Sequence, residues 1–404
     1  MTNPEVPVAL TTASLTRRNG LQGALAALLG GLAPAAAADA ALGAGRQSAP
    51  DEERRCPPAC RGQLGCTGKL CVCQKEAGCE IRRKQLTHKT PVLIPLYSNA
   101  WDAGNDRLLV TNSLGLRACN QNLGTLWSVD SWVPAPGWQT VFLSVGAVTG
   151  DQIAVNVIQS DGCAPESRLM IVDDQRLLNN QPPIWQTDPY SLLFGGIEYN
   201  PTNGLIYASV LEGAPGVFIF DPKKTGADSL VRVWDGANGT PAFVNALGMT
   251  VDAAGLIYVT GMLVDGQIGA FCYRPDGRFV RAYGVGEFGM PAAICVGADG
   301  LVYVADPMLG RVHVFDNDGR PRALLGRGSR METAGGLGGV IGVAVNPRNH
   351  LYTVNLATFQ SQPVVAFGGS DAAVCTMAPD SEAETIEVMM KRFVLPGWSG
   401  NSTR

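Results

Sequence analysis

The chain has 404 residues, of which 46% are hydrophobic and 16% charged, with 49 Gly and 26 Pro. This composition is typical of a globular, β-rich chain of short segments and many turns, and it excludes disordered and long-helical proteins. The formal net charge of −4, without a long block of Lys or Arg, excludes the basic footprint that binding to nucleic acid or to an anionic membrane surface requires.

Residues 1–40 are typical of an export signal peptide. The paired Arg17 and Arg18 precede the apolar run Leu21–Leu32, and the small residues AAAADA supply a cleavage site. The run is too short to span a bilayer, so we expect no membrane span here. The arginine pair resembles a twin-arginine signal, and export by the general secretory route stays open as the alternative. Either route predicts a periplasmic or extracellular mature protein.

A cysteine-rich segment spans residues 56–79, between linkers at 41–55 and 80–90. Its cysteines are Cys56, Cys60, Cys66, Cys71, Cys73 and Cys79. Because so short a segment cannot bury enough apolar surface to hold itself folded, this density in an exported chain predicts a disulfide-stapled module. A thiolate metal site stays open as the alternative, although the segment has no C-x2-C pair and the nearest histidine is His88.

The C-x4-C-x-C centre of this segment resembles an EGF-like module. The resemblance implies disulfides that join Cys56 to Cys66, Cys60 to Cys71 and Cys73 to Cys79. Six cysteines allow many pairings, so the spacing alone does not select this one.

An internal repeat begins at about Pro91. Each unit shows one strand, a tight turn and a second strand, as in AICVGADGLVYVADP from Ala293. The equivalent turn positions are Asp102, Thr149, Asn200, Asp252, Gly297 and Asn346. They lie 45 to 52 residues apart, which is the period of an array of small supersecondary units.

A second hairpin follows the first within each unit. Asp276-Gly277 and Asp318-Gly319 lie between alternating apolar and polar runs, which is a strong hairpin signal. Each unit therefore predicts four antiparallel strands, and no helical period of ten or more residues separates them. Because one such sheet cannot cover its own apolar faces, the fold class that we predict is all-β, a six-bladed β-propeller of four-stranded blades.

The fifth unit, PAAICVGADGLVYVADPMLGRVHVFDNDGRPRALLGRG, resembles an NHL repeat. The match is good in the fourth and fifth units, fair in the third and sixth, and weak in the first two. The resemblance implies a six-bladed NHL-type propeller over residues 91–375, with degenerate early blades. We expect the apolar segment Pro91–Tyr97 to be the outer strand that closes the ring against the last blade.

The tail, residues 376–404, predicts one amphipathic helix. Ser381 and Glu384 have the spacing of a capping box, apolar residues recur with helical period over Ile386–Phe393, and Pro396 is a stop signal. Its methionines are expected to pack on the propeller surface.

Catalytic motifs are scarce in this sequence. The only histidines are His88, His313 and His350, which are too few and too scattered for the channel zinc site that the NHL-type amidating lyase implies. A serine or cysteine hydrolase needs a base beside its nucleophile, and no G-x-S-x-G elbow occurs. A histidine-based site is therefore disfavoured, and we assign no catalytic residue.

Oxygen ligands for calcium remain a candidate chemistry. Gluconolactonases, which are also six-bladed propellers, hold a divalent ion at the channel mouth and use it to polarise a carbonyl. The corresponding candidates, at or just beyond the end of each second strand, are Asn112, Asn156, Glu212, Asp265, Asp306 and Asn355. The alternative reading makes Asp306 and its equivalents strand-end residues that accept backbone hydrogen bonds at a bend. Glu198 lies inside a predicted strand, at an offset that does not match the gluconolactonase pattern.

Two functions therefore remain open. The first is an exported, monomeric binding module whose ligand is a protein, a glycan or a small molecule. The second is a calcium-dependent, gluconolactonase-like hydrolase or lyase with its metal at the channel mouth. We favour the binding module because the sequence assembles no catalytic constellation, so calcium is the one cofactor to test and none is assigned.

Overall fold

The computed structural model describes residues 64–67, 70–73, 80–86, 96–112, 115–121, 123–129, 132–133, 139–160, 166–212, 216–325, 339–356 and 362–367. The chain divides into two units, and these residues all belong to the unit Gln47–Met389. The other unit, Met1–Arg46 with Met390–Arg404, lies outside the described residues. The predicted signal peptide (1–40) and the whole predicted tail (376–404), with its helix, lie outside the described residues and stay predictions.

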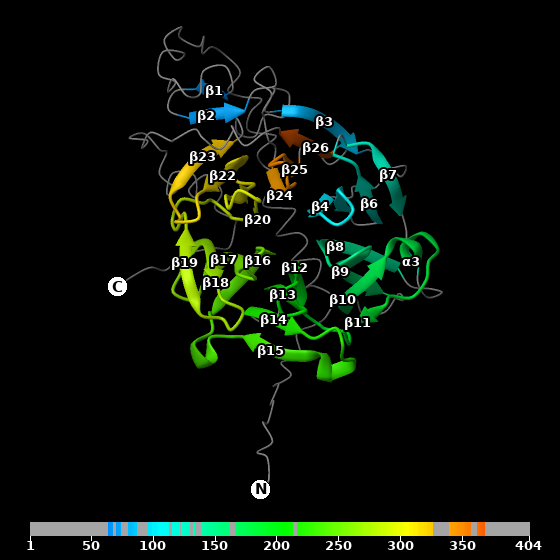
Figure 1. Ribbon diagram of the computed structural model, residues 1–404. Helices are drawn as coiled ribbons and strands as arrows, with labels where there is room; N and C mark the ends of the chain where they lie inside the picture. The colour runs from blue at the N-terminus through cyan, green and yellow to red at the C-terminus, as the bar shows by residue number, and fades with distance from the viewer. Residues whose placement is uncertain are drawn as a thin grey trace, which may run out of the picture. The chain divides into compact units, whose positions relative to one another are not determined.

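Three four-stranded antiparallel sheets form the first half of the ring (Figure 1). The first contains β4 (Leu96–Asp102), β5 (Arg107–Asn112), β6 (Gly115–Cys119) and β7 (Thr125–Val129). The second contains β8 (Gln139–Ala147), β9 (Gln152–Ser160), β10 (Glu166–Asp173) and β11 (Trp185–Gln186), with the short helix α3 (Asp174–Leu178) before β11. The third contains β12 (Leu193–Asn200), β13 (Leu205–Glu212), β14 (Gly216–Phe220) and β15 (Leu230–Trp234).

Two further sheets continue the same up-and-down order, and part of a sixth follows them. The fourth contains β16 (Phe243–Val251), β17 (Ile257–Leu263), β18 (Ile268–Tyr273) and β19 (Phe279–Tyr283). The fifth contains β20 (Ala293–Val296), β21 (Val302–Asp306), β22 (Arg311–Phe315) and β23 (Pro321–Leu325). The sixth begins with β24 (Gly339–Val345), β25 (Leu351–Leu356) and β26 (Gln362–Phe367). Short 3-10 turns, η5 (Gly226–Ser229) and η6 (Ala237–Gly239), flank β15.

The sixth sheet is completed from the other end of the domain. Its outer strand is β3 (Glu80–Leu86), which pairs antiparallel with β26. This corrects two expectations: part of the segment 80–90 is a strand rather than a linker, and Pro91–Tyr97 does not close the ring, because β4 begins at Leu96. The sequence EIRRKQL is charged, which suits the exposed outer edge of a sheet. Because it lacks the apolar alternation of the other strands, the sequence pattern does not predict a strand here.

The first strand of every sheet lies nearest the axis. β4, β8, β12, β16, β20 and β24 each contact the next in this order, and β24 contacts β4, so the sheets close into a ring (Figure 1). The six anchor positions of the sequence repeat fall in the turns that join first and second strands or at the strand ends beside them. The predicted all-β propeller with four-stranded antiparallel blades is thereby confirmed.

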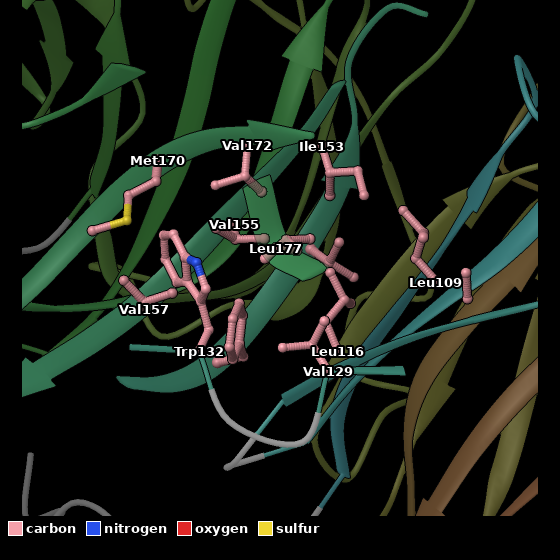
Figure 2. Close-up of a cluster of buried hydrophobic side chains, with 13 residues drawn as sticks. Leu109, Leu116, Val129, Trp132, Ile153, Val155, Val157, Met170, Val172 and Leu177 are labelled. Atoms are coloured by element: carbon pink, nitrogen blue, oxygen red, sulfur yellow. The ribbon is translucent and has the colours of Figure 1, made fainter. Parts of the chain in front are cut away.

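Apolar side chains fill the space between neighbouring sheets. Figure 2 shows the cluster between the first two blades, to which the first blade contributes Leu109 and Leu116 and the second contributes Val155. Trp132 is fully buried in this cluster, with its ring centroid 6.0 Å from that of Phe142. Because each blade buries both faces in this way, the second strands are apolar on both faces rather than alternating.

The predicted Asp-Gly turns join the outer strands. Gly277 and Gly319 have φ values of 89° and 84°, a left-handed conformation that glycine adopts without strain. Asp316 stabilises the second of these turns, because its Oδ1 accepts hydrogen bonds from the backbone N–H groups of Asp318 and Arg320, both at 2.9 Å.

Two small segments complete the description. β1 (Leu64–Thr67) pairs antiparallel with β2 (Leu70–Cys73), with Cys66 opposite Cys71. The cysteine side chains of the segment 56–79 lie outside the described residues, so the disulfide pairing stays a prediction. Within the described residues, no helix is both long enough and apolar enough to cross a bilayer.

Candidate functional site

A cavity of about 420 Å³ lies on the axis of the ring. Residues from all six first strands line it, and at one end it reaches the turns between first and second strands, where Gly104, Thr149 and Gly150 are exposed. This volume lies within the range of small-molecule sites in proteins.

The first strands approach one another closely around this cavity. A Cβ atom added to Gly195 of β12 would lie 2.3 Å from the carbonyl oxygen of Leu247 in β16. A Cβ added to Gly248 would likewise lie 2.6 Å from the carbonyl oxygen of Ala292, just before β20. Glycine is therefore required where neighbouring inner strands touch backbone to backbone, and this contact keeps the cavity narrow.

One register level of the ring contains Glu198, the lining acid without an ion pair among the described residues. The six first-strand residues that pair with equivalent positions of the second strands are Ala100, Gly146, Glu198, Thr250, Cys295 and Ala344. All but Gly146 and Ala100 follow the same cross-strand pattern, opposite a tyrosine of the second strand. The sixth, first and second blades contribute alanine or glycine at this level, whereas the third, fourth and fifth contribute polar side chains. At this level, therefore, small residues line one side of the ring and polar residues line the other.

Glu198 is the charged group of this level. Burial raises the pKa of its carboxyl to about 8, and no basic group among the described residues opposes this shift. Its carboxyl makes no hydrogen bond with the described residues. A Cβ added to Gly146 would lie 3.3 Å from Oε2 of Glu198, so the glycine leaves room for the carboxyl beside β8. At neutral pH this group is a protonated acid that faces the cavity.

Cys295 lies on the same level. Burial raises the pKa of its thiol, and the nearby carboxyl of Glu198 raises it further. Because the thiolate is the nucleophilic form, this cysteine is an unreactive thiol at neutral pH. Thr250, with 9% of its surface exposed, adds a hydroxyl from β16. The arrangement thus offers hydrogen-bonding groups rather than an activated nucleophile.

The other acid that lines the cavity, Asp102, is neutralised. Its Oδ2 accepts a hydrogen bond from Nε of Arg107 at 2.7 Å, and Arg107 also pairs with Asp174 at the start of α3. The guanidinium lies 5.6 Å from the ring of Trp127, which adds a cation–π contact. Among the described lining residues, Glu198 is the acid without a cationic partner.

The predicted ligand residues whose side chains the structure describes do not line this cavity. Asn156 is fully buried in β9, and its Nδ2 donates to the carbonyl oxygen of Phe194 at 2.8 Å. Asn355 is fully buried in β25, where its Nδ2 donates to Oγ1 of Thr353 at 2.9 Å. Asp265 is exposed in the turn after β17 and accepts a hydrogen bond from the backbone of Gln267. The side chains of Asn112 and Glu212 lie outside the described residues.

Asp306 has a structural environment of its own. It is fully buried at the end of β21, and its carboxylate accepts hydrogen bonds from four backbone N–H groups. The donors are Gly289 (2.7 Å), Met290 (3.3 Å), Met308 (3.1 Å) and Leu309 (3.2 Å). Burial raises its pKa to about 6 although these donors lower it. The carboxylate therefore joins two loops at the end of the fifth blade, as the strand-end reading proposes.

His313 lies beside this carboxylate. Its Nε2 is 3.8 Å from Oδ2 of Asp306, and its ring packs 4.7 Å from that of Phe288, measured between centroids. Burial lowers the pKa of His313 to about 3, with a smaller contribution from Arg311, so the imidazole is neutral at physiological pH. The distance exceeds that of a hydrogen bond, and the two groups do not form a catalytic pair.

The described members of the predicted calcium set do not fit a shared ion. The amide of Asn156 donates to the next blade and that of Asn355 to its own strand, Asp265 lies in an exposed turn, and the oxygens of Asp306 accept from backbone N–H groups. Calcium requires six to eight oxygen ligands that converge on one point. Across the described residues, no three acidic, histidine or cysteine side chains gather in a way that could hold a metal ion.

Glu198 is the cavity residue to which the sequence interpretation gave no role. It was placed correctly in a strand, but its offset from the gluconolactonase pattern removed it from the candidates. The signal that identifies Glu198 is its position in the first strand of its blade, two residues before the anchor Asn200. That position faces the axis only once the sheets are closed into a ring.

The ring of sheets and the axial cavity define the class of this protein as a β-propeller with four-stranded antiparallel blades. No protein-family model matches the chain, and no curated protein matches it. Among solved structures it is similar to the PQQ-bound aldose sugar dehydrogenase from Streptomyces coelicolor, with 13% identity, a TM-score of 0.47, and coverage of 72% of this chain and 99% of that one.

Two further solved structures are similar. A gluconolactonase from Xanthomonas campestris has 13% identity and a TM-score of 0.45, covering 72% of this chain and 92% of that one. A chain of the nidogen/laminin complex has 14% identity and a TM-score of 0.42, covering 57% and 79%. The likeness concerns the fold, and the activities of these proteins are not transferred to this chain.

Proposed function

We propose that this chain is an exported β-propeller that binds a small ligand in its axial cavity. The observation that carries the proposal is the carboxyl of Glu198, which faces the cavity without a hydrogen-bonding or cationic partner among the described residues. Glu198 is partly exposed, so a ligand that enters the cavity can reach its carboxyl and form a hydrogen bond with it.

The geometry favours binding over hydrolysis. The described candidates for a calcium site are committed to the backbone or to an exposed turn, and the thiol of Cys295 is not activated. Hydrolysis of a lactone or ester needs an activated nucleophile or a polarised carbonyl at a single point. The cavity offers hydrogen-bonding groups and a volume of about 420 Å³, which is sufficient for recognition.

The test is a fragment screen on the purified full chain, followed by calorimetry on each fragment that raises the unfolding temperature. Ala100→Val reduces the space at the level of Glu198, and Ala237→Val is the matched control because Ala237 is exposed in η6. We expect Ala100→Val to weaken binding about tenfold, or about 1.4 kcal/mol. Glu198→Gln removes the acid without changing volume and serves as the second variant. Ligands that bind all three variants as tightly as the wild type would place binding elsewhere and overturn the proposal.

A further inference from the structure

The axial cavity contains an acid that has no cationic partner among the described residues. Glu198 is the one lining acid outside an ion pair, since Asp102 is held by Arg107. No Lys, Arg or His is among the described residues that line the cavity. The other lining residues with a titratable side chain are Cys295 of β20 and Tyr199 of β12, whose side chains are acids rather than bases. Every ionisation here therefore adds negative charge.

The backbone at the axis adds further acceptors. Each first strand pairs with only one neighbour, the second strand of its own blade, so its other edge faces the axis. The peptide groups on such an edge are unpaired by the sheet and offer carbonyl oxygens to a donor in the cavity. A group with several N–H donors can therefore bond to Glu198 and to these carbonyls together.

The space beside Glu198 is small and partly apolar. Ala100, Gly146 and Ala344 occupy the same level with little or no side chain, while Val145 and Met249 line the wall next to it. A compact apolar body fits this wall. Among the described residues, no three acidic, histidine or cysteine side chains gather in a way that could hold a metal ion, whereas one carboxylate is enough for one organic ammonium group.

We infer that the axial cavity binds a small primary ammonium ion whose N–H groups donate to the Glu198 carboxylate. This inference rests on the proposed function and names the chemistry of its ligand. Binding converts a neutral carboxylic acid into a carboxylate paired with a cation. The carboxyl therefore releases its proton to the solvent as the ammonium enters, and no covalent bond to the ligand forms or breaks.

The experiment compares n-butylammonium chloride with 1-butanol, which has the same apolar body and no charge. Sodium and calcium chloride are the inorganic cation controls. Thermal unfolding of the purified full chain is followed at pH 6 and pH 9 for the wild type and Glu198→Gln. Asp265→Asn is the matched control because it removes an exposed carboxyl. Calorimetry at pH 7 in buffers of different ionisation enthalpy counts the protons released.

We expect butylammonium to raise the unfolding temperature of the wild type and of Asp265→Asn, more at pH 9 than at pH 6. The apparent affinity should fall by up to about tenfold for each pH unit below the pKa of Glu198. Glu198→Gln should lose the effect, and binding at pH 7 should release about one proton per ligand. Butanol and the salts should leave the unfolding temperature unchanged.

Each contrary result has a distinct meaning. An equal shift with butanol and butylammonium would overturn the ammonium inference while leaving a cavity that binds small ligands. An equal shift with sodium or calcium would replace the organic cation by an inorganic one. In a third outcome, butylammonium leaves the unfolding temperature unchanged while uncharged fragments bind and lose affinity in Ala100→Val. That result would overturn the ammonium inference and leave the proposed function standing. If no fragment and no probe binds, both the inference and the proposed function are overturned.

Discussion

The Nδ2 atom of Asn156 donates a hydrogen bond of 2.8 Å to the carbonyl oxygen of Phe194, so a second-strand residue of one blade is tied to the first strand of the next. The same connection recurs at the equivalent position of the third blade, where Oγ of Ser209 donates to the carbonyl oxygen of Leu247 at 2.9 Å. In both cases the acceptor lies at or beside an irregularity in the strand register, where the sheet leaves carbonyls unpaired.

We predict that Asn156→Ala lowers the free energy of unfolding by about 1–3 kcal/mol, because the buried carbonyl of Phe194 loses its donor. Asn179→Ala is the control, since the amide of Asn179 is exposed and bonds within its own helix end. Denaturant unfolding measures both. A loss no greater in Asn156→Ala than in the control would show that the bond between blades contributes nothing.

The carboxylate of Asp306 should be the most costly acid to remove in the fifth blade. Asp306→Ala leaves four backbone N–H groups without their acceptor, so we expect a loss of about 2–4 kcal/mol at pH 7. Asp306→Asn should lose less, because its amide oxygen still accepts. Asp276→Ala, in an exposed turn, is the control. Hydrogen exchange at Gly289 and Met308 should accelerate in Asp306→Ala, and unchanged exchange there would contradict the role of Asp306 as a tie between loops.

Glu198 should make stability depend on pH. Its pKa is raised from 4.5 in the unfolded chain to about 8 in the folded one, so the folded state binds the proton more tightly. Its favourable contribution is complete below pH 4.5, declines as pH rises, and is lost above pH 8. Glu198→Gln stays neutral, so we expect it to gain about 3 kcal/mol relative to the wild type between pH 5 and pH 9.

Denaturant unfolding of the wild type and Glu198→Gln across this pH range measures that difference. The contribution of Asp306 cancels because both proteins retain it. A difference that is independent of pH would mean that the Glu198 carboxyl titrates alike in the folded and unfolded states.

Gly248 should tolerate no side chain. A Cβ at this position would lie 2.6 Å from the carbonyl oxygen of Ala292 and 2.7 Å from Cα of Ala293, both backbone atoms of the neighbouring blade. We expect Gly248→Ala to cost about 3 kcal/mol or more, or to prevent folding. Gly104→Ala is the control, because its nearest neighbours would lie at 3.4 Å. Circular dichroism and thermal unfolding compare the two, and equal stability would refute the close approach of the strands.

Removal of divalent cations should leave the propeller unchanged. Because the described members of the predicted calcium set are used elsewhere, we expect the same unfolding temperature with and without a chelator. A channel ion that binds the folded state would instead raise that temperature by mass action. If the chelator lowered the unfolding temperature by several degrees and calcium restored it, the result would contradict this prediction and support the calcium-dependent hydrolase.

Much of the architecture is readable from local pattern. The repeated turns at positions such as Asp252 and Gly297, and the Asp-Gly turns at Gly277 and Gly319, correctly predict four antiparallel strands per blade. These signals are local because a turn depends on the backbone preferences of a few consecutive residues. The closing strand was missed because Glu80–Leu86 is charged and has no turn signal to mark it as a member of the last sheet.

The candidate site was less readable. Asp306 ends its strand as predicted, whereas Asn156 lies in the middle of β9 rather than at its end. The hydrogen-bond partners of Asn156 and Asp306, Phe194 and Gly289, lie 38 and 17 residues away in sequence. A short polar side chain at a strand end looks the same whether it faces a ligand or a backbone group of the next blade. The distinction depends on which strand lies opposite, and no local pattern contains that information.

The repeat, the strand order within each blade and the turns between strands follow from local sequence, because they depend on short-range periodicity and on the conformational limits of Gly, Asn and Asp. That β3 completes the sixth sheet and that Glu198 shares an axial cavity with Cys295 become visible when the chain is folded. These two facts arise when distant strands are brought together by ring closure, which removes water from Glu198 and gives its carboxyl the raised pKa on which the proposed ligand chemistry depends.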